Sequence, residues 1–319
     1  MDFKIDVPDL TVERQGNTGT PGVWHFDSGV AGPNVLLTAL THGNELCGAW
    51  VLKDLLADSG SLTAAALKQG TLTLAFCNLA AFDRFDLAAH DASRFVEEDL
   101  NRVWSQAKLS DPKSIERRRA LALQPWVRKA DWMLDFHSMH EPSPPLLLTG
   151  LLQRNIELAK RLGMPRHVIV DAGHKDGTRM RDFEQFGDAD GNALALLIEC
   201  GFHGDESSVQ VAQEMAGQFL TTSGIIDRAA LPAHWSRAEP APADQKILKV
   251  TAPVVAQSMN LTFTQPFQGM ECIEKAGTVI GYDNGQPITT PYDRCVLVMP
   301  SLRQLVPGVS VVRFAHQLD

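Results

Sequence analysis

The fold is decided by residues 34–56, which read NVLLTALTHGNELCGAWVLKDLL. The first part, Asn34–Leu40, is an apolar run of strand length, and the last part, Glu45–Leu56, is helix-like. Further runs of strand length lie at Thr71–Cys77, Trp132–Phe136, Leu146–Thr149, His167–Val170 and Ala193–Ile198. Helix-like segments lie at Pro112–Lys129, Arg154–Leu162 and Ser208–Leu220. This alternation predicts an α/β fold with a mixed, largely parallel sheet and flanking helices.

The pattern changes after about residue 225. Residues Leu231–Gln245 contain three prolines among alanines and polar residues, which is typical of a linker. Strand-like pieces and turn signals follow at Lys246–Thr251, Asp283–Gly285, Cys295–Met299, Val306–Gly308 and Val309–Phe314. We therefore predict a catalytic domain at 1–230, a linker at 231–245 and a smaller β-rich domain at 246–319.

Composition limits the class of partner and the compartment. The 319 residues carry a net charge of −9, which argues against a nucleic-acid binder because such proteins present a basic face. No apolar stretch is long enough for a membrane helix, and the N-terminus lacks the pattern of a signal peptide. The five cysteines are scattered and form no CxxC motif. We expect a cytoplasmic protein that binds neither nucleic acid nor membrane.

The first candidate site is Thr41-His42-Gly43-Asn44-Glu45, between the first strand and the helix. His42 and Glu45 are three residues apart at a turn, so their side chains can bind one ion. We expect Glu45 in the first helical turn, where the helix dipole favours a negative charge, and Gly43 to permit a tight turn. The alternative is a helix N-terminus with an incidental histidine.

The second candidate is Asp135-Phe136-His137, at the end of a predicted strand. A side chain at the carboxyl end of such a strand points into the crevice where open α/β sheets bind ligands. The alternative is a histidine satisfied near the edge of the core. Asp135 either holds the imidazole of His137 or faces the other side of the sheet, and His140 is a competing ligand.

The third candidate is Glu199, which ends the apolar run Ala193–Ile198. A carboxylate buried there without a partner would be costly, so it either pairs within the structure or is exposed for a task. Two histidines and one glutamate leave an open zinc position for water. A separate glutamate can then accept the proton of that water and return it to a leaving amine.

The fourth candidate is Asp99-Leu100-Asn101-Arg102. The planar guanidinium of Arg102 matches a carboxylate, and Asn101 can add a further donor. The alternative is a solvated turn with a surface arginine. Two other features receive structural interpretations, because Glu116–Arg119 is typical of a solvated helix face and Cys200 of a small buried side chain.

These motifs together resemble a known family. His42-Gly43-Asn44-Glu45, Asp99-Leu100-Asn101-Arg102, Asp135-Phe136-His137 and Ile198-Glu199-Cys200-Gly201 follow the order and approximate spacing of the succinylglutamate desuccinylase/aspartoacylase family. That family has a zinc-carboxypeptidase-like fold, and its C-terminal β-domain is similar in kind. The resemblance implies one zinc ion per chain, held by His42, Glu45 and His137, with Glu199 as the general acid/base.

The resemblance also implies that Asn101 and Arg102 bind a substrate carboxylate. Family members typically have Asn-Pro-Arg-Ala after the second strand, where the arginine polarises the scissile carbonyl, but this chain has Asn78-Leu79-Ala80-Ala81. The further substrate-binding candidates are Arg94, with Arg84 as the alternative, Arg181, with Arg179 nearby, and Tyr292, with Tyr282 as the alternative.

The expected function is that of a zinc-dependent amidohydrolase, a deacylase that cleaves a linear amide in a small N-acyl amino acid or similar carboxylate-bearing substrate. The alternatives are a metallocarboxypeptidase or ester deacylase on the same site, and a non-catalytic metal-containing binding protein. The sequence leaves a homo-oligomer open.

Overall fold

A long mixed sheet runs through the whole molecule. The computed structural model describes residues 3–57, 64–173, 175–235 and 244–318. Within these residues the main sheet has eleven strands in the order β1-β3-β2-β4-β7-β5-β6-β8-β14-β13-β10. Its N-terminal strands are β1 (Val23–Asp27), β2 (Asn34–Ala39), β3 (Thr71–Phe76), β4 (Trp132–Met139), β5 (Leu146–Leu148), β6 (His167–Val170) and β7 (Leu194–Phe202).

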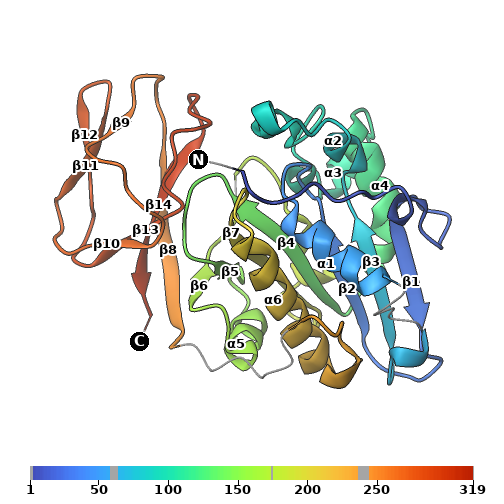
Figure 1. The fold of residues 1–319 in the computed structure, drawn as a ribbon. Helices are drawn as coiled ribbons and strands as arrows, with labels where there is room; N and C mark the ends of the chain where they lie inside the picture. The colour runs from blue at the N-terminus through green and yellow to red at the C-terminus, as the bar shows by residue number, and fades with distance from the viewer. Residues whose placement is uncertain (1–2, 58–63, 174, 236–243, 319) are drawn as a thin grey trace.

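Helices cover both faces of this part of the sheet. They are α1 (Cys47–Leu56), α2 (Leu79–Phe82), α3 (Gln106–Leu109), α4 (Ile115–Lys129), α5 (Gln153–Leu162) and α6 (Ser207–Ser223). Figure 1 shows α1 and α6 side by side in front of strands β2, β4 and β7, and these two helices contact each other. The predicted α/β class with flanking helices is confirmed.

The two faces have separate cores because successive residues of a strand point to opposite sides. Leu37 and Leu134 pack in the cluster that contains the buried faces of α1 and α6. Their neighbours Leu36 and Met133 pack in a second cluster with Leu123 of α4. A strand that buries apolar residues on both faces has a continuous apolar sequence. Strands β2, β3, β4 and β7 can therefore be predicted from the sequence.

The register brings the predicted motifs to one edge of the sheet. Strand β4 runs parallel to both β2 and β7, and Thr38 lies opposite Asp135 while His137 lies opposite Glu199. The segment 41–45 follows directly on β2. The carboxyl ends of these three strands therefore meet, as in other open parallel sheets that bind ligands at this edge.

The C-terminal strands continue the same sheet. They are β8 (Lys246–Val255), β10 (Glu271–Ile273), β13 (Cys295–Val298) and β14 (Ser310–Gln317), while β9 (Thr262–Phe263), β11 (Val279–Asp283) and β12 (Gln286–Thr289) form a separate three-stranded sheet. Strand β8 pairs in parallel with β6 and antiparallel with β14. The smaller β-rich C-terminal part is confirmed, and it shares a sheet with the rest. Most of the expected linker, residues 236–243, lies outside the described residues.

Turn chemistry explains one C-terminal hairpin. Asn284 and Gly285 connect β11 to β12 with φ of 49° and 78°. A two-residue hairpin turn with positive φ at both positions suits asparagine and glycine.

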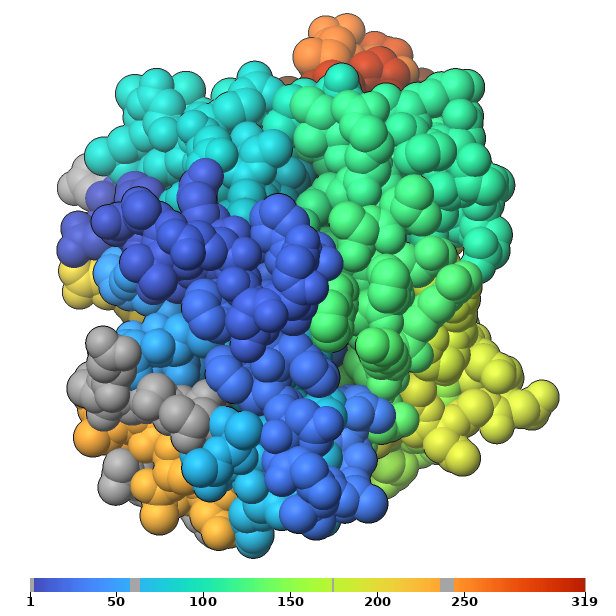
Figure 2. Space-filling view, turned by 90° about the vertical axis from the view of Figure 1, so that its right-hand side faces the viewer, coloured from blue at the N-terminus to red at the C-terminus, as the bar shows by residue number. Residues whose placement is uncertain are grey.

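The N-terminal region adds an antiparallel strand that the sequence analysis does not predict. Strand β1 pairs with β3 at the edge of the sheet. Figure 2 shows the N-terminal segment beside α4, where Arg119 Nη2 donates to the carbonyl of Pro21 at 2.8 Å. None of the helices in the described residues combines the length and the apolar character that crossing a membrane requires.

Candidate active site and metal centre

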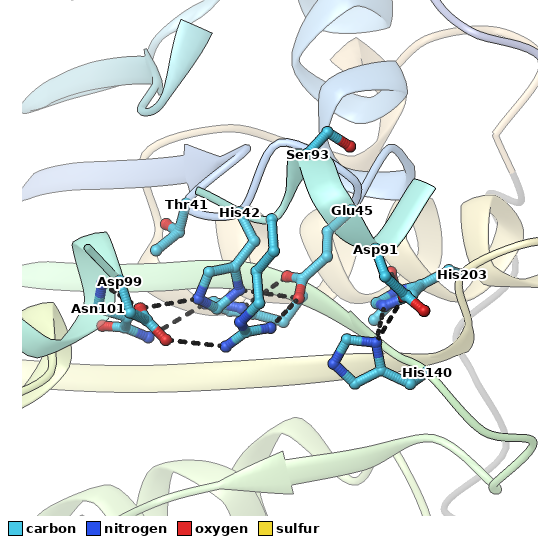
Figure 3. A network of polar contacts seen from close by, with 12 residues as sticks. Thr41, His42, Glu45, Asp91, Ser93, Asp99, Asn101, His140 and His203 are labelled. Atoms are coloured by element: carbon cyan, nitrogen blue, oxygen red, sulfur yellow. Dashed lines mark hydrogen bonds and ion pairs between the residues drawn. The ribbon is translucent and has the colours of Figure 1, made fainter. Parts of the chain in front are cut away.

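Two imidazoles and one carboxylate meet at the carboxyl edge of the sheet. Nδ1 of His42 lies 2.8 Å from one carboxylate oxygen of Glu45, and Nδ1 of His137 lies 2.7 Å from the other. Among the described residues these three form a group with one ligand atom each, all within 4.8 Å of one another. All three side chains are buried. The arrangement could hold a metal ion (Figure 3).

The far nitrogen of each ring is held by a second carboxylate. Nε2 of His42 lies 3.0 Å from Asp99 Oδ1, and Nε2 of His137 lies 2.7 Å from Asp135 Oδ2. The hydroxyls of Thr38 and Thr41 donate to the other oxygen of Asp135 at 2.7 and 2.9 Å. Carboxylates in this position orient metal-binding histidines and fix which nitrogen faces the ion. Of the two orientations left open for Asp135, the structure has the one that holds His137.

The backbone of residues 40–45 is constrained by its neighbours. Leu40 directly follows β2 and has a φ of 55°, a conformation that non-glycine residues rarely adopt. Gly43 keeps a negative φ, and a Cβ there would lie 2.4 Å from Ala81 C and Ser93 O. The expected turn is present, since the backbone N–H of Glu45 donates to the carbonyl of His42 at 3.2 Å, but it is close packing that requires glycine at position 43. Helix α1 begins at Cys47, so Glu45 lies just before the helix and not in its first turn.

Neighbouring charges, more than burial, determine the direction in which the pKa values of Glu45 and His137 are shifted. Burial alone would raise the pKa of Glu45, but the neighbouring charges of His42 and His137 lower it well below its usual value. Burial would lower the pKa of His137, and the charges of Asp135 and Glu45 instead raise it well above its usual value. His137 therefore carries a positive charge within this buried ion network, and binding of a metal would displace its proton.

Glu199 lies beside this group on β7, opposite His137 in the parallel register. The side chain is buried, and its Oε2 has no hydrogen-bond partner among the described residues. Burial, together with the negative charge of Glu45, raises the pKa of Glu199 to about 8. An unpaired carboxyl of this kind in a cleft is typical of a functional group and not of a structural pair.

A cavity of about 820 Å³ opens over these residues. Its floor includes His42, Glu45, His137 and Glu199. One wall comes from the connection between β13 and β14, including Met299, Arg303 and Val309, and from Arg313 in β14. The volume is in the range of small-molecule sites, so the C-terminal strands help to enclose a pocket for a small ligand.

Arg94 links the metal-binding group to the cavity. Its guanidinium lies 3.5 Å from Glu45 Oε1 and 3.0 Å from Asp99 Oδ2, and the residue lines the cavity. Arg84, the alternative candidate, is exposed and bonds the carbonyl of Val96. The sequence left this choice open, and the structure brings only Arg94 of the two to the cavity.

Asn101 and Arg102 also line the cavity. The amide nitrogen of Asn101 is 3.5 Å from Nε2 of His137, and its oxygen accepts a hydrogen bond from the Met180 backbone at 2.9 Å. Arg102 donates to the carbonyl of Asn101 at 2.8 Å. Asn101 is therefore held by the protein, while Arg102 is a lining residue of the cavity.

The structure does not bring Arg181 or Tyr292 to the cavity. Arg181 is buried in the core, where its guanidinium donates to the carbonyl of Thr149 at 2.7 Å. The hydroxyl of Tyr292 lies 2.8 Å from Thr251 Oγ1 within the C-terminal strands. Arg179 does line the cavity, and it pairs with the buried Asp171 at 2.8 Å.

His140 belongs to a different group of contacts. Its Nδ1 lies 3.2 Å from both Asp91 Oδ1 and Nε2 of His203, as Figure 3 shows. Burial is the main reason that the pKa of His140 falls to about 4. His140 therefore lines the cavity as a neutral side chain, apart from the group formed by His42, Glu45 and His137.

Glu116 has a role that the sequence analysis missed. The side chain is buried, and its carboxylate accepts backbone N–H groups from Val96 at 2.7 Å and from Glu97 and Glu98 at 3.2 Å. These bonds hold the loop that leads to Asp99. The expectation of a solvated face is wrong at Glu116, because the partners of the carboxylate come from a loop about twenty residues away.

The comparisons with known proteins agree with this geometry. The sequence profile of the Succinylglutamate desuccinylase/Aspartoacylase catalytic domain matches residues 31–190, which is half of the chain. The chain therefore belongs to the succinylglutamate desuccinylase/aspartoacylase family. Membership supports a hydrolase that removes an acyl group. A search of curated proteins found no match.

Solved structures share the fold at low sequence identity. A succinylglutamate desuccinylase/aspartoacylase from Rhodobacter sphaeroides is 20% identical with a TM-score of 0.64, covering 91% of this chain and 87% of that one. The succinylglutamate desuccinylase from Chromobacterium violaceum is 18% identical with a TM-score of 0.65, covering 94% and 89%. The ectoine utilization protein EutE (DoeB) from Ruegeria pomeroyi is 17% identical with a TM-score of 0.64, covering 89% and 85%.

Proposed function

We propose that this protein is a zinc-dependent amidohydrolase that removes the acyl group from a small N-acyl amino acid or a similar carboxylate-bearing amide. The observation that carries the proposal is the position of Glu199. Its buried carboxyl lies on the strand next to His137, at the floor of a cavity of about 820 Å³. A separate acid/base beside a two-histidine, one-glutamate ligand set is the arrangement that metal-assisted amide hydrolysis needs.

The donor chemistry fits zinc. Imidazole nitrogen and carboxylate oxygen are both zinc ligands, and a catalytic zinc site uses three protein ligands. His42 and His137 would bind through Nδ1, because Asp99 and Asp135 hold their Nε2 atoms. When bound, zinc would supply Lewis-acid polarisation of the scissile carbonyl and lower the pKa of water.

The residues of the chain have distinct parts in the reaction. Glu199 takes the proton of the attacking water and later gives it to the departing nitrogen. Arg94 donates to the oxygen of the scissile carbonyl as charge develops there. Arg102 binds a carboxylate of the substrate through its planar guanidinium, which fixes the distance between the amide and the floor of the cavity. Asn101 keeps the adjoining loop in place.

The wall that the C-terminal strands provide favours a small substrate. Eight residues of the segment 299–309 line the cavity, so a long peptide would have to displace them. This favours a linear amide over the peptide substrate of a carboxypeptidase. An ester with the same shape would fit equally well, and direct comparison of amide and ester substrates separates these two activities.

The test is a Glu199→Gln variant assayed on N-acetyl, N-formyl and N-succinyl amino acids, with metal measured in the same samples. We expect the wild type to hydrolyse at least one amide. We expect the variant to keep its zinc and lose at least about a hundredfold in kcat, since general acid–base catalysis contributes that much or more. The exposed Glu206→Gln provides a control with the same change in charge.

Two results would overturn the proposal. Hydrolysis that survives complete removal of metal would exclude the metal-assisted mechanism. A wild type that carries zinc and binds these amides without turnover would instead be a metal-containing binding protein, and Glu199→Gln would then leave its affinity for the amide nearly unchanged.

A further inference from the structure

A group of hydrogen-bonded side chains beside the cavity has no part in the roles proposed above. His140, the first residue after β4, lines the cavity together with Asp91. Nδ1 of His140 lies 3.2 Å from Asp91 Oδ1, and it lies at the same distance from Nε2 of the buried His203. Nδ1 of His203 in turn lies 2.7 Å from Ser138 Oγ. These contacts hold the His140 ring by one of its two nitrogens.

The partners of Nδ1 determine which nitrogen of His140 carries the proton. Burial is the main reason that the pKa of His140 falls to about 4, so the ring is neutral and has a single N–H. A carboxylate oxygen can only accept a hydrogen bond, so Nδ1 donates to Asp91 Oδ1. The same oxygen lies 3.3 Å from Nδ1 of His90, and Arg303 holds the other oxygen at 3.4 Å. Nε2 of His140 is then the nitrogen with a lone pair, and it can accept a hydrogen bond.

Nε2 of His140 is free to contact a ligand in the cavity. Among the residues that the structure describes, this atom has no hydrogen-bond partner. Figure 3 shows it on the side of the ring away from Asp91 and His203. Burial and then the charge of Arg94 lower the pKa of His140, whereas the charge of Glu45 raises it. His140 therefore lies within electrostatic range of the metal-binding group and offers a free acceptor beside it.

The carboxylates that line the cavity are already in use. Glu199 has the role of acid/base proposed above, and Asp176 is exposed to solvent, where water competes for its oxygens. Three further carboxylates pair with arginines, namely Asp99 with Arg94, Asp171 with Arg179 and Glu141 with Arg303. His140 differs from all of these as an uncharged acceptor with a free lone pair.

A free acceptor in this place matches one of the two polar groups of an amide. The carbonyl oxygen of an amide accepts, and its N–H donates. Arg94 supplies a donor for the oxygen, as proposed above, and His140 supplies an acceptor for the N–H. An ester of the same shape has no N–H and places an oxygen lone pair in that position. Since the cavity wall admits both shapes, a polar contact has to make any distinction between them.

We propose that Nε2 of His140 accepts a hydrogen bond from the N–H of the scissile amide, and that this contact favours amides over esters of the same shape. This inference rests on the proposed function and adds a catalytic residue to the same site. Asp91 and His203 are positioning residues, because they hold the ring and keep its proton on Nδ1. A site built to hydrogen-bond an N–H rejects the analogue that lacks it, because the acceptor is then left unpaired.

The kinetic test compares His140→Leu, which removes the acceptor, with the wild type on a matched pair of substrates. The amide is the panel compound that the wild type hydrolyses fastest, and the ester has an oxygen in place of its N–H. For N-acetyl-alanine this ester is 2-acetoxypropanoate. We expect His140→Leu to lose about tenfold or more in kcat/KM on the amide, because the N–H is left without a partner. The change on the ester should stay below about twofold.

Three further variants separate this contact from a structural effect. His140→Gln keeps an acceptor in its side-chain carbonyl and should recover part of the loss on the amide. Asp91→Asn can donate to Nδ1 and so move the proton to Nε2, which should lower the amide-to-ester ratio of kcat/KM without changing the zinc content. The exposed His234→Leu should behave as the wild type. Equal losses of His140→Leu on amide and ester would show a structural role for His140 and overturn the proposal.

A binding experiment gives a readout that does not depend on turnover. The zinc-loaded Glu199→Gln variant is titrated in a calorimeter with each N-acyl amino acid of the panel and with the matched ester. We expect the amide to bind about tenfold more tightly than its ester. The double variant Glu199→Gln/His140→Leu should bind the two alike. A preference that persists in the double variant, or no preference in Glu199→Gln, would contradict the contact.

The two proposals can fail separately. If no amide is hydrolysed but Glu199→Gln binds the amide more tightly than the ester through His140, the contact stands and the deacylase proposal fails. If amides are hydrolysed and His140→Leu leaves the amide-to-ester ratio of kcat/KM unchanged, the deacylase stands and the contact is excluded.

Discussion

The carboxylate of Asp135 lies 2.7 Å from Nε2 of His137, on the side of the ring away from Glu45. Thr38 and Thr41 occupy the other oxygen of Asp135, so this side chain has one orientation. The imidazole is thereby fixed with Nδ1 toward Glu45. Removing the carboxylate should affect the metal without removing a ligand.

Asp135→Asn tests this relationship. We expect the variant to bind zinc about ten- to a hundredfold more weakly than the wild type, as is common when the carboxylate behind a metal-binding histidine is lost. Competition with a chromophoric chelator measures the affinity. The exposed Asp190→Asn is the control. Unchanged affinity in Asp135→Asn would show that the contact does not support a metal ligand.

His42→Ala tests the ligand assignment itself. The variant lacks one of the three donors, so we expect purified protein to contain far less than one zinc ion per chain and to be inactive. Elemental analysis after dialysis measures the content. His234→Ala, at an exposed histidine, should keep its zinc. A fully occupied His42→Ala protein would contradict the assignment.

Arg102→Lys tests carboxylate binding. Lysine keeps the positive charge but cannot form two parallel hydrogen bonds to a carboxylate. We expect KM to rise about tenfold with a smaller change in kcat, because one strong hydrogen bond is lost. Steady-state kinetics on the best N-acyl amino acid gives both constants, and Arg294→Lys is the matched surface variant. An unchanged KM would exclude the clamp.

The pair formed by Asp171 and Arg179 should make stability depend on pH. Although burial alone would raise it, the charge of Arg179 lowers the pKa of Asp171 from 3.8 to about 2. The ionised pair therefore stabilises the folded protein by about 2 kcal/mol. This contribution is complete above the pKa that Asp171 has in the unfolded chain, and it is lost as the pH falls through the lower pKa of Asp171 in the folded protein.

Urea unfolding of the wild type and Asp171→Asn, between pH 7 and pH 3, measures this effect. We expect a constant difference in unfolding free energy from pH 7 to pH 5, and the pair's contribution to shrink by roughly half at pH 3. A difference that does not change with pH would show that Asp171 is not ionised in the folded protein.

Gly43→Ala tests the close packing beneath the site. The new Cβ would meet the backbone of Ala81, Phe82 and Ser93 at 2.4–2.5 Å. We expect a loss of about 1–3 kcal/mol in stability, or more, together with weaker zinc binding. Thermal unfolding measures the first effect. At Gly191 a Cβ makes only ordinary contacts of 3.4 Å, so Gly191→Ala should be tolerated.

Much of the catalytic part of the fold follows from local sequence. The buried strands β2, β3, β4, β6 and β7 are continuous apolar runs, and α1, α4, α5 and α6 have helical patterns. Strand β1 is not predicted because it lies at the edge of the sheet, where only Val23 of its five residues VWHFD is fully buried. A short edge strand depends on its neighbour for hydrogen bonds, and nothing local marks it.

The site residues likewise fall into those that the sequence predicts and those that it does not. His42, Glu45, His137 and Glu199 are recognisable because each follows or ends an apolar strand, and parallel pairing brings such positions to one edge. The contribution of Glu116 is not recognisable, because its partners come from a distant segment. Arg181 and Tyr292 were predicted to bind substrate because of their residue types, but both form contacts away from the cavity.

The sequence by itself determined the α/β class, the family motifs and the residues able to bind a metal, because periodicity and spacing are properties of short segments. Only the tertiary structure decided which carboxylate orients each imidazole, which arginines face the cavity and that the C-terminal strands extend the main sheet. Asp135 and His137 are two residues apart, but the sequence leaves open which way Asp135 faces, and His42 and Asp99 are 57 residues apart. Only the packed chain fixes the distances between such side chains.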